Sequence, residues 1–183
     1  MPEYDSFDRP SKIEDDYSFV TPKIKEKIIR LFEVQAFWLA DNEMEGYCCL
    51  ECISTGRVYE WIHFLSCYPS PSLIPKHGDM IQGYLSINNV NKETKVDNNT
   101  VKKLKWGPYC HVEGCLEILD FDESCGILCQ IPDEDEFIIV ENLYGFELKI
   151  GDHFTFSGSP CIREGLHDYK VINGERVTWI MSE

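Results

Sequence analysis

The chain has 183 residues, of which 43% are hydrophobic, and a formal net charge of −15 at pH 7. This length and composition predict one or two compact domains, and with no apolar run of 18 residues we expect no membrane association. The acidic, polar first residues are unlike a secretory signal peptide. We therefore expect the nine cysteines to be reduced thiols in the cytoplasm or nucleus.

The N-terminal part of the chain predicts a tail and one helix. Residues 1–20 lack a hydrophobic pattern, which indicates a flexible acidic tail. A helix is predicted over residues 21–33, because Thr21-Pro22 is typical of a helix N-terminus and apolar side chains follow at helical spacing. Beyond residue 33, β-branched and aromatic runs separated by Gly, Pro and Asn turns predict short strands.

The strand-rich part of the chain is a tandem repeat. Gly78-Asp79 matches Gly151-Asp152, and Trp106 matches Trp179, in both cases 73 positions later. A repeat of this period predicts two small domains of one type.

We place the two copies at residues 34–107 and 108–183, with Gly107-Pro108 at the junction. Each copy has room for five short strands, and closing such a small sheet into a barrel removes its exposed edges. The expected fold class is therefore all-β, with two tandem five-stranded barrels preceded by one short α-helix.

Segments of both copies resemble the cold-shock domain, a family of OB-fold barrels. In the first copy, EGYCCL at 45–50 is similar to the glycine-aromatic strand of the family, and WIHFLS at 61–66 is similar to its aromatic-histidine strand. In the second copy, GCLEILD at 114–120 resembles the first strand and LKIGD at 148–152 resembles the Gly-Asp segment. The resemblance covers about residues 34–180 and implies binding of single-stranded nucleic acid.

In the resembling family, unpaired bases stack on aromatic side chains, and each stacked base contributes about 1–3 kcal/mol. Strand alternation places Trp61 and His63 on one face of their strand and Tyr47 on the matching face of its own, with Phe37 or Trp38 joining them. Three nearby lysines are available for phosphate. The candidate nucleic-acid-binding residues are Trp38, Tyr47, Trp61, His63, Phe64, Lys102, Lys103 and Lys105.

The second copy has lost the aromatic side chains at these positions. The corresponding residues are Cys125, Ile127, Phe137 and Ile139, and residues 109–183 carry a net charge of −12. Aliphatic side chains do not stack a series of bases, and this charge repels phosphate. The pattern predicts an apolar face that either docks a protein partner with a basic or apolar surface or packs against the first barrel.

No motif indicates catalysis or a bound cofactor, because no nucleophile elbow, phosphate-binding glycine loop or zinc-protease motif occurs. A metal site pooled from Cys110, His111, Cys115, Cys125 and Cys129 is the weakest alternative, because extended strands space ligands poorly. We predict a non-catalytic, RNA-associated adaptor whose first barrel binds single-stranded RNA weakly and whose second barrel docks a protein. The alternative is a pure protein-interaction scaffold that has lost nucleic-acid binding.

Overall fold

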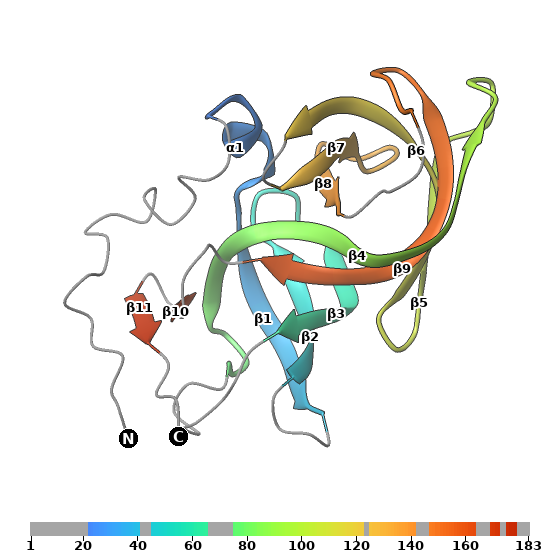
Figure 1. The fold of residues 1–183 in the computed structure, drawn as a ribbon. Helices are drawn as coiled ribbons and strands as arrows, with labels where there is room; N and C mark the ends of the chain where they lie inside the picture. Colours follow the sequence, from blue (N-terminus) through green and yellow to red (C-terminus); the bar gives the residue numbers. More distant parts are fainter. Residues whose placement is uncertain are drawn as a thin grey trace, which may run out of the picture.

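Strands make up most of the computed structural model, and one short helix precedes them (Figure 1). The structure describes residues 22–40, 45–65, 75–122, 125–141, 147–163, 169–172 and 175–178. The elements are α1 (Pro22–Ile28), β1 (Arg30–Leu39), β2 (Glu45–Cys52), β3 (Val58–Leu65), β4 (Met80–Val96), β5 (Lys103–Gly107), β6 (His111–Asp122), β7 (Gly126–Gln130), β8 (Phe137–Val140), β9 (His153–Arg163), β10 (Tyr169–Ile172) and β11 (Glu175–Thr178). The predicted all-β class with one short helix is confirmed. Within the described ranges, no helix has the length and apolar character that crossing a bilayer requires.

The helix is shorter than the predicted 21–33, because the chain becomes a strand at Arg30. In β1 the buried side chains of Phe32 and Val34 alternate with more exposed ones, which is the period of a strand and not of a helix. Phe32 pairs with Ile81 of β4. Sheet pairing therefore overrides the helical spacing seen in the sequence.

The strands form one hydrogen-bonded sheet in the order β1-β2-β3-β9-β6-β7-β8-β4-β10-β11, and β5 pairs with β6. Further pairings of β4 with β1 and with β9 close two rings of five strands. The first ring is β1-β2-β3-β9-β4, and the second ring is β6-β7-β8-β4-β9. Figure 1 shows β4 and β9 running side by side as long curved strands between the two rings.

Hydrogen bonding thus crosses the predicted boundary at residues 107 and 108. Each copy supplies four consecutive strands to its own ring and receives the fifth strand from the other copy. The received strand lies parallel to the third strand, as the pairs His63–Cys161 and Ser86–Ile139 show. β5, which ends the first copy, lies outside both rings and pairs with β6.

The core is continuous through both rings. One buried cluster combines side chains such as Phe32 and Ile62 of the first copy with Leu116 and Phe154 of the second. Two glycines allow the shared strands to approach closely. A Cβ atom on Gly83 would lie 2.4 Å from the carbonyl oxygen of Arg163, and one on Gly158 would lie 2.6 Å from Ile87 Cγ2.

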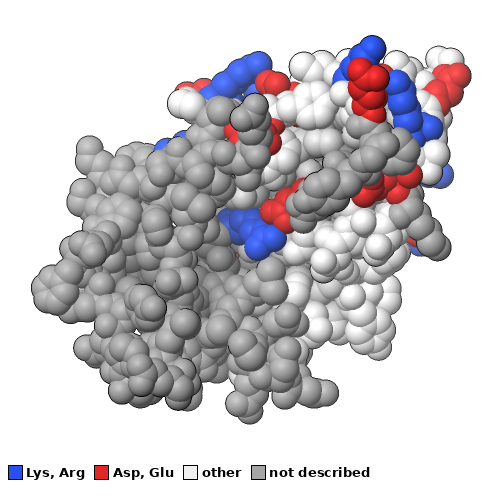
Figure 2. All heavy atoms as spheres, viewed as in Figure 1, with Lys and Arg blue, Asp and Glu red and all other residues white. Residues whose placement is uncertain are grey.

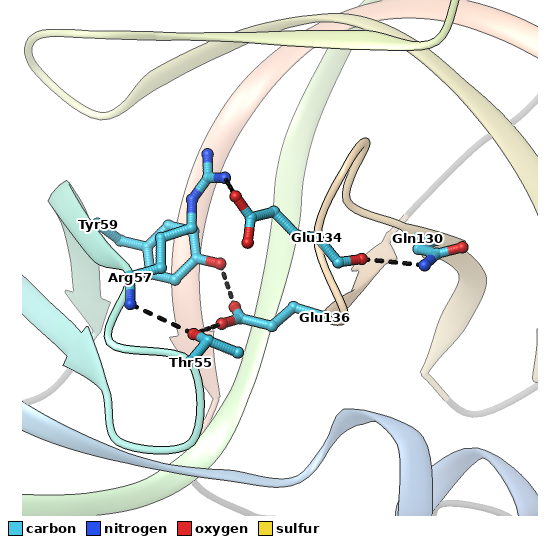
Figure 3. Close-up of polar contacts among 6 residues, drawn as sticks. All are labelled: Thr55, Arg57, Tyr59, Gln130, Glu134 and Glu136. Carbon is cyan, nitrogen blue, oxygen red and sulfur yellow. Dashed lines mark hydrogen bonds and ion pairs between the residues drawn. The ribbon is translucent and has the colours of Figure 1, made fainter.

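A buried carboxylate joins the turn between β2 and β3 to the loop between β7 and β8 (Figure 3). Glu136 is only 2% exposed, and it accepts hydrogen bonds from the hydroxyls of Thr55 and Tyr59. Arg57 forms an ion pair with Glu134, and its guanidinium lies 5.2 Å from the centroid of the Tyr59 ring. Because burying a carboxylate without hydrogen-bond donors is costly, these contacts fix the start of β3 against the second copy.

We predict that Gly83→Ala lowers the free energy of unfolding by about 1–3 kcal/mol, the usual cost of overpacking, because the shared strands must separate. Gly107→Ala is the control, since its nearest atoms would lie 3.6 Å away, in ordinary contact. Urea unfolding followed by circular dichroism measures both variants. Equal stability of the two would contradict the close approach of β4 and β9.

We predict that Tyr59→Phe lowers the free energy of unfolding at pH 7 by about 1–3 kcal/mol, because Glu136 loses a donor. Burial, followed by the hydrogen bond to Glu136, raises the pKa of Tyr59 in the folded state. Its contribution to stability is therefore present below the ordinary tyrosine pKa of about 10 and is lost as the pH rises beyond it. Urea unfolding between neutral and alkaline pH should show a shallower alkaline decline for the variant.

The matched control for the loss of a hydroxyl is Tyr109→Phe, because Tyr109 is exposed. It should change the unfolding free energy at pH 7 by less than about 0.5 kcal/mol. If Tyr59→Phe is as stable as this control, the hydrogen bond from Tyr59 to Glu136 does not stabilise the fold.

Candidate functional site

Side chains of β2 and β3 alternate between the core and the outer face of the first ring. The inward side chains are those of Cys48, Leu50, Ile62 and Phe64. The partly exposed side chains on the outer face are those of Tyr47, Cys49, Trp61 and His63. The predicted alternation of Tyr47, Trp61 and His63 is confirmed, and β1 and β2 pair Trp38 with Tyr47.

Aromatic rings from several strands gather on this outer face. We call this cluster the aromatic surface, and its members are Trp38, Tyr47, Trp61, His63 and Tyr109. Trp38 stacks on Trp61 with ring centroids 5.5 Å apart and planes inclined by 17°. Tyr47 stacks on His63 at 5.7 Å and 27°, and a Tyr47–Trp61 contact at 6.3 Å connects the two pairs.

A bulge in β3 determines the direction of Trp61. The register between β2 and β3 shifts between Cys48 and Leu50, so that Glu60 and Trp61 both lie opposite Cys49. Trp61 has φ 57°, a left-handed conformation that is rare for a bulky residue and costs about 1–2 kcal/mol. Bulges re-aim side chains, and this one turns Trp61 toward the other aromatic rings.

One predicted binding residue does not belong to this surface. Phe64 is 0% exposed, and its ring meets that of Phe37 edge-on at 5.6 Å. It is a core residue, because it follows the outward-facing His63 directly along β3. Of the two β1 candidates, Trp38 joins the aromatic surface, while Phe37 packs against the core.

The three predicted lysines have different surroundings. Lys102 Nζ lies 3.1 Å from Glu117 Oε2, and this hydrogen bond is the main cause that lowers the pKa of the Glu117 carboxyl. Lys103 and Lys105 are exposed on β5 and form no ion pair with any residue that the structure describes. Lys102 is thus already neutralised, and Lys103 and Lys105 are available to a ligand.

The sequence analysis did not single out Tyr109. It lies in the turn between β5 and β6, and its ring centroid is 5.2 Å from that of Trp61, with planes inclined by 41°. The available signal was its place beside the Gly107-Pro108 junction, where a turn exposes its central residues.

The corresponding face of the second copy is covered by α1. Cys125 and Ile139 are buried in a cluster with Ile24 and Ile28, which lie four residues apart on one face of the helix.

The two other predicted protein-binding residues, Ile127 and Phe137, also pack within the chain. Ile127 is buried in the main core, and Phe137 lies at the margin of the α1 cluster with Lys27 Nζ 5.5 Å from its ring centroid. Of the two alternatives left open by the sequence, docking of a partner and packing within the protein, the burial of Cys125, Ile127 and Ile139 favours packing within the chain. Ile139 is 0% exposed and lies in one buried cluster with Ile24 and Ile28 of α1 and with Tyr84 of β4.

Charged side chains are unevenly distributed over the described surface in Figure 2. Figure 2 shows basic and acidic side chains close together along the upper part of the described surface. The lower right of the described surface in this view is largely white, which marks residues other than Lys, Arg, Asp and Glu. The β5–β6 hairpin, whose turn carries Tyr109, has exposed charged residues of both signs in Lys103, Lys105 and Glu113.

The thiols of Cys49 and Cys110, beside members of the aromatic surface, and of Cys125, beneath α1, are not activated for chemistry. Burial, and next the negative charge of Glu60, raise the pKa of Cys49. Burial also raises the pKa of Cys110 and of Cys125 to about 12. Thiols with raised pKa values remain protonated at neutral pH and are poor nucleophiles and metal ligands.

Comparisons of the chain with family models, curated proteins and solved structures find no match. The function is therefore inferred from the geometry of the site.

We predict that Ile139→Ala lowers the free energy of unfolding by about 2–5 kcal/mol, because it opens a cavity beneath α1. Ile150→Ala is the control, because Ile150 is exposed and should change stability by less than about 0.5 kcal/mol. Thermal or urea unfolding of both variants checks this. An Ile139→Ala protein of unchanged stability would show that α1 does not cover this face in solution.

Proposed function

We propose that the protein is a non-catalytic, RNA-associated adaptor whose first copy binds unpaired bases of single-stranded RNA on the aromatic surface. The observation that carries the proposal is the convergence of four rings predicted to bind bases. Trp38, Tyr47, Trp61 and His63 come from three strands and form two connected stacked pairs. Aromatic faces accept any base, so this arrangement suits binding without strong sequence preference.

We also propose that the two rings of five strands are OB-like barrels. In OB folds, the face of strands 2 and 3 binds oligonucleotides. β2 and β3 hold these places in the first ring and carry Tyr47, Trp61 and His63. The strained φ of Trp61 adds support, because backbone strain is found preferentially at functional sites.

Charge limits the affinity that we expect. The chain has a net charge of −15, which repels a phosphate backbone, so stacking must supply most of the binding free energy. We therefore expect dissociation constants in the micromolar range or weaker that increase with salt. Every cysteine among the described residues is a free thiol, in keeping with action in the cytoplasm or nucleus.

The decisive test is titration of a labelled single-stranded RNA at low salt, followed by fluorescence anisotropy. Trp38→Ala should bind roughly 5- to 150-fold more weakly than wild type, which is the loss of one stacked base at about 1–3 kcal/mol. Trp38 is 48% exposed, so its removal should leave the fold intact.

Phe121→Ala is the matched control, because Phe121 is an exposed aromatic residue of β6 outside the aromatic surface. It should bind as wild type does. If wild-type protein does not bind RNA, or Trp38→Ala binds as tightly as Phe121→Ala, the proposed function is wrong.

The protein-interaction scaffold remains the second candidate, and the acidity of the chain favours it. Exposed tryptophan faces also bind cations, and an Arg- or Lys-rich segment would be attracted to a chain of net charge −15. A labelled basic peptide titrated against the same variants separates the two functions. If the wild-type protein binds the peptide but not RNA, and Trp38→Ala loses the peptide, the protein is an interaction scaffold.

A further inference from the structure

The hairpin formed by β5 and β6 brings an unusually exposed ring to the aromatic surface. Tyr109 is 80% exposed although its ring contacts Trp61. So exposed a ring buries little apolar area, and the contact therefore contributes little to stability. Most of the Tyr109 residue therefore remains accessible to a ligand.

The backbone at this contact is strained on both sides. Tyr109 has φ 58° and the next residue, Cys110, has φ 53°, while Trp61 has φ 57°. These are three of the five non-glycine residues with positive φ in the described ranges. Left-handed conformations cost about 1–2 kcal/mol each, and their concentration at one contact points to a role in binding.

The same hairpin carries Lys103 and Lys105, which form no ion pair with a described residue, although Glu113 lies opposite Lys105 in the pairing of β5 with β6. Lys103 and Lys105 alternate along β5 with Leu104 and Trp106, which pack against the core. Both lysines line an open groove of about 670 Å³ that also contains Glu113. Glu113 lies 3.5 Å from His111, which is on the same strand.

We propose that the β5–β6 hairpin is a second arm of the binding site. Tyr109 stacks on a base at the edge of the aromatic surface, and Lys105 and Lys103 bind the phosphates of the nucleotides that follow along β5. The ligand is then a single strand that passes from the first copy onto the junction between the copies, and not a mononucleotide. This inference rests on the proposed function, and it adds the length of the bound strand and its path over the protein surface.

The first part of the test compares single-stranded RNA of about 4 and about 12 nucleotides, within the range of site sizes for one OB fold. Wild type should bind the longer RNA at least about tenfold more tightly, because only the longer strand reaches β5. Affinity is measured against salt concentration, since each phosphate contact to a single strand contributes about 0.7 to the slope of log K against log salt.

The double variant Lys103→Gln with Lys105→Gln should reduce the slope for the longer RNA by about 1.4 and leave binding of the shorter RNA unchanged. The matched control is Lys76→Gln with Lys149→Gln, which removes two positive charges from exposed lysines in the turns before β4 and β9. This control should keep the wild-type slope.

Tyr109→Ala should weaken binding of the longer RNA roughly 5- to 150-fold, and Tyr109→Phe should retain it. RNA containing 4-thiouridine should also cross-link to Tyr109 on irradiation, which a purely structural role would not produce. Thermal unfolding of each variant excludes loss of fold.

The two proposals fail in different ways. If Tyr109→Ala and the Lys103/Lys105 variant both behave as wild type while Trp38→Ala loses binding, the second arm is wrong and the proposed function stands. If the control pair lowers the salt slope as much as the β5 pair, the lysines act only through net charge, and the path along β5 is overturned. If neither RNA binds to wild type, both proposals are wrong.

Discussion

The antiparallel pairing of β4 with β9 runs from Tyr84–Arg163 to Val96–His153, and it places both copies relative to each other. β9 pairs at its C-terminal end with β3 and at its N-terminal end with β6. One strand therefore positions both the element that carries Trp61 and the hairpin that carries Tyr109. The aromatic surface depends on this pairing, because its rings come from segments on both sides of the junction between the copies.

Equivalent faces of the two rings have taken different roles within one chain. In the first ring the outer face of β2 and β3 is open and aromatic, and in the second ring α1 covers the equivalent positions. An amphipathic helix needs an apolar partner, and Ile24 and Ile28 find it beside Ile139. An aliphatic face can thus be covered within the chain, whereas the aromatic surface remains at least partly exposed.

Local patterns predicted the strands and the shared face of Trp61 and His63, because alternation is a property of each strand alone, and the family resemblance implied that this face points outward. The exchange of the fifth strand between copies could not be predicted, since pairing such as His63–Cys161 leaves no local period in the sequence. The resemblance of residues 61–66 to the aromatic-histidine strand implies a binding role for Phe64, but its place next to the outward-facing His63 puts it in the core. Tyr109 reaches Trp61 only through tertiary structure, which no pattern within the β5–β6 turn records.

The shared strands also have a consequence for synthesis on the ribosome. The pairing of β3 with β9 cannot form until Cys161, the partner of His63, has been translated almost a hundred residues later. At about 5–20 residues per second, the first ring remains open for roughly 5–20 s, with β3 and β4 edges unpaired. Such long-range pairing slows folding, and open edges recruit other chains. The nascent protein is therefore expected to need chaperone protection until β9 leaves the exit tunnel.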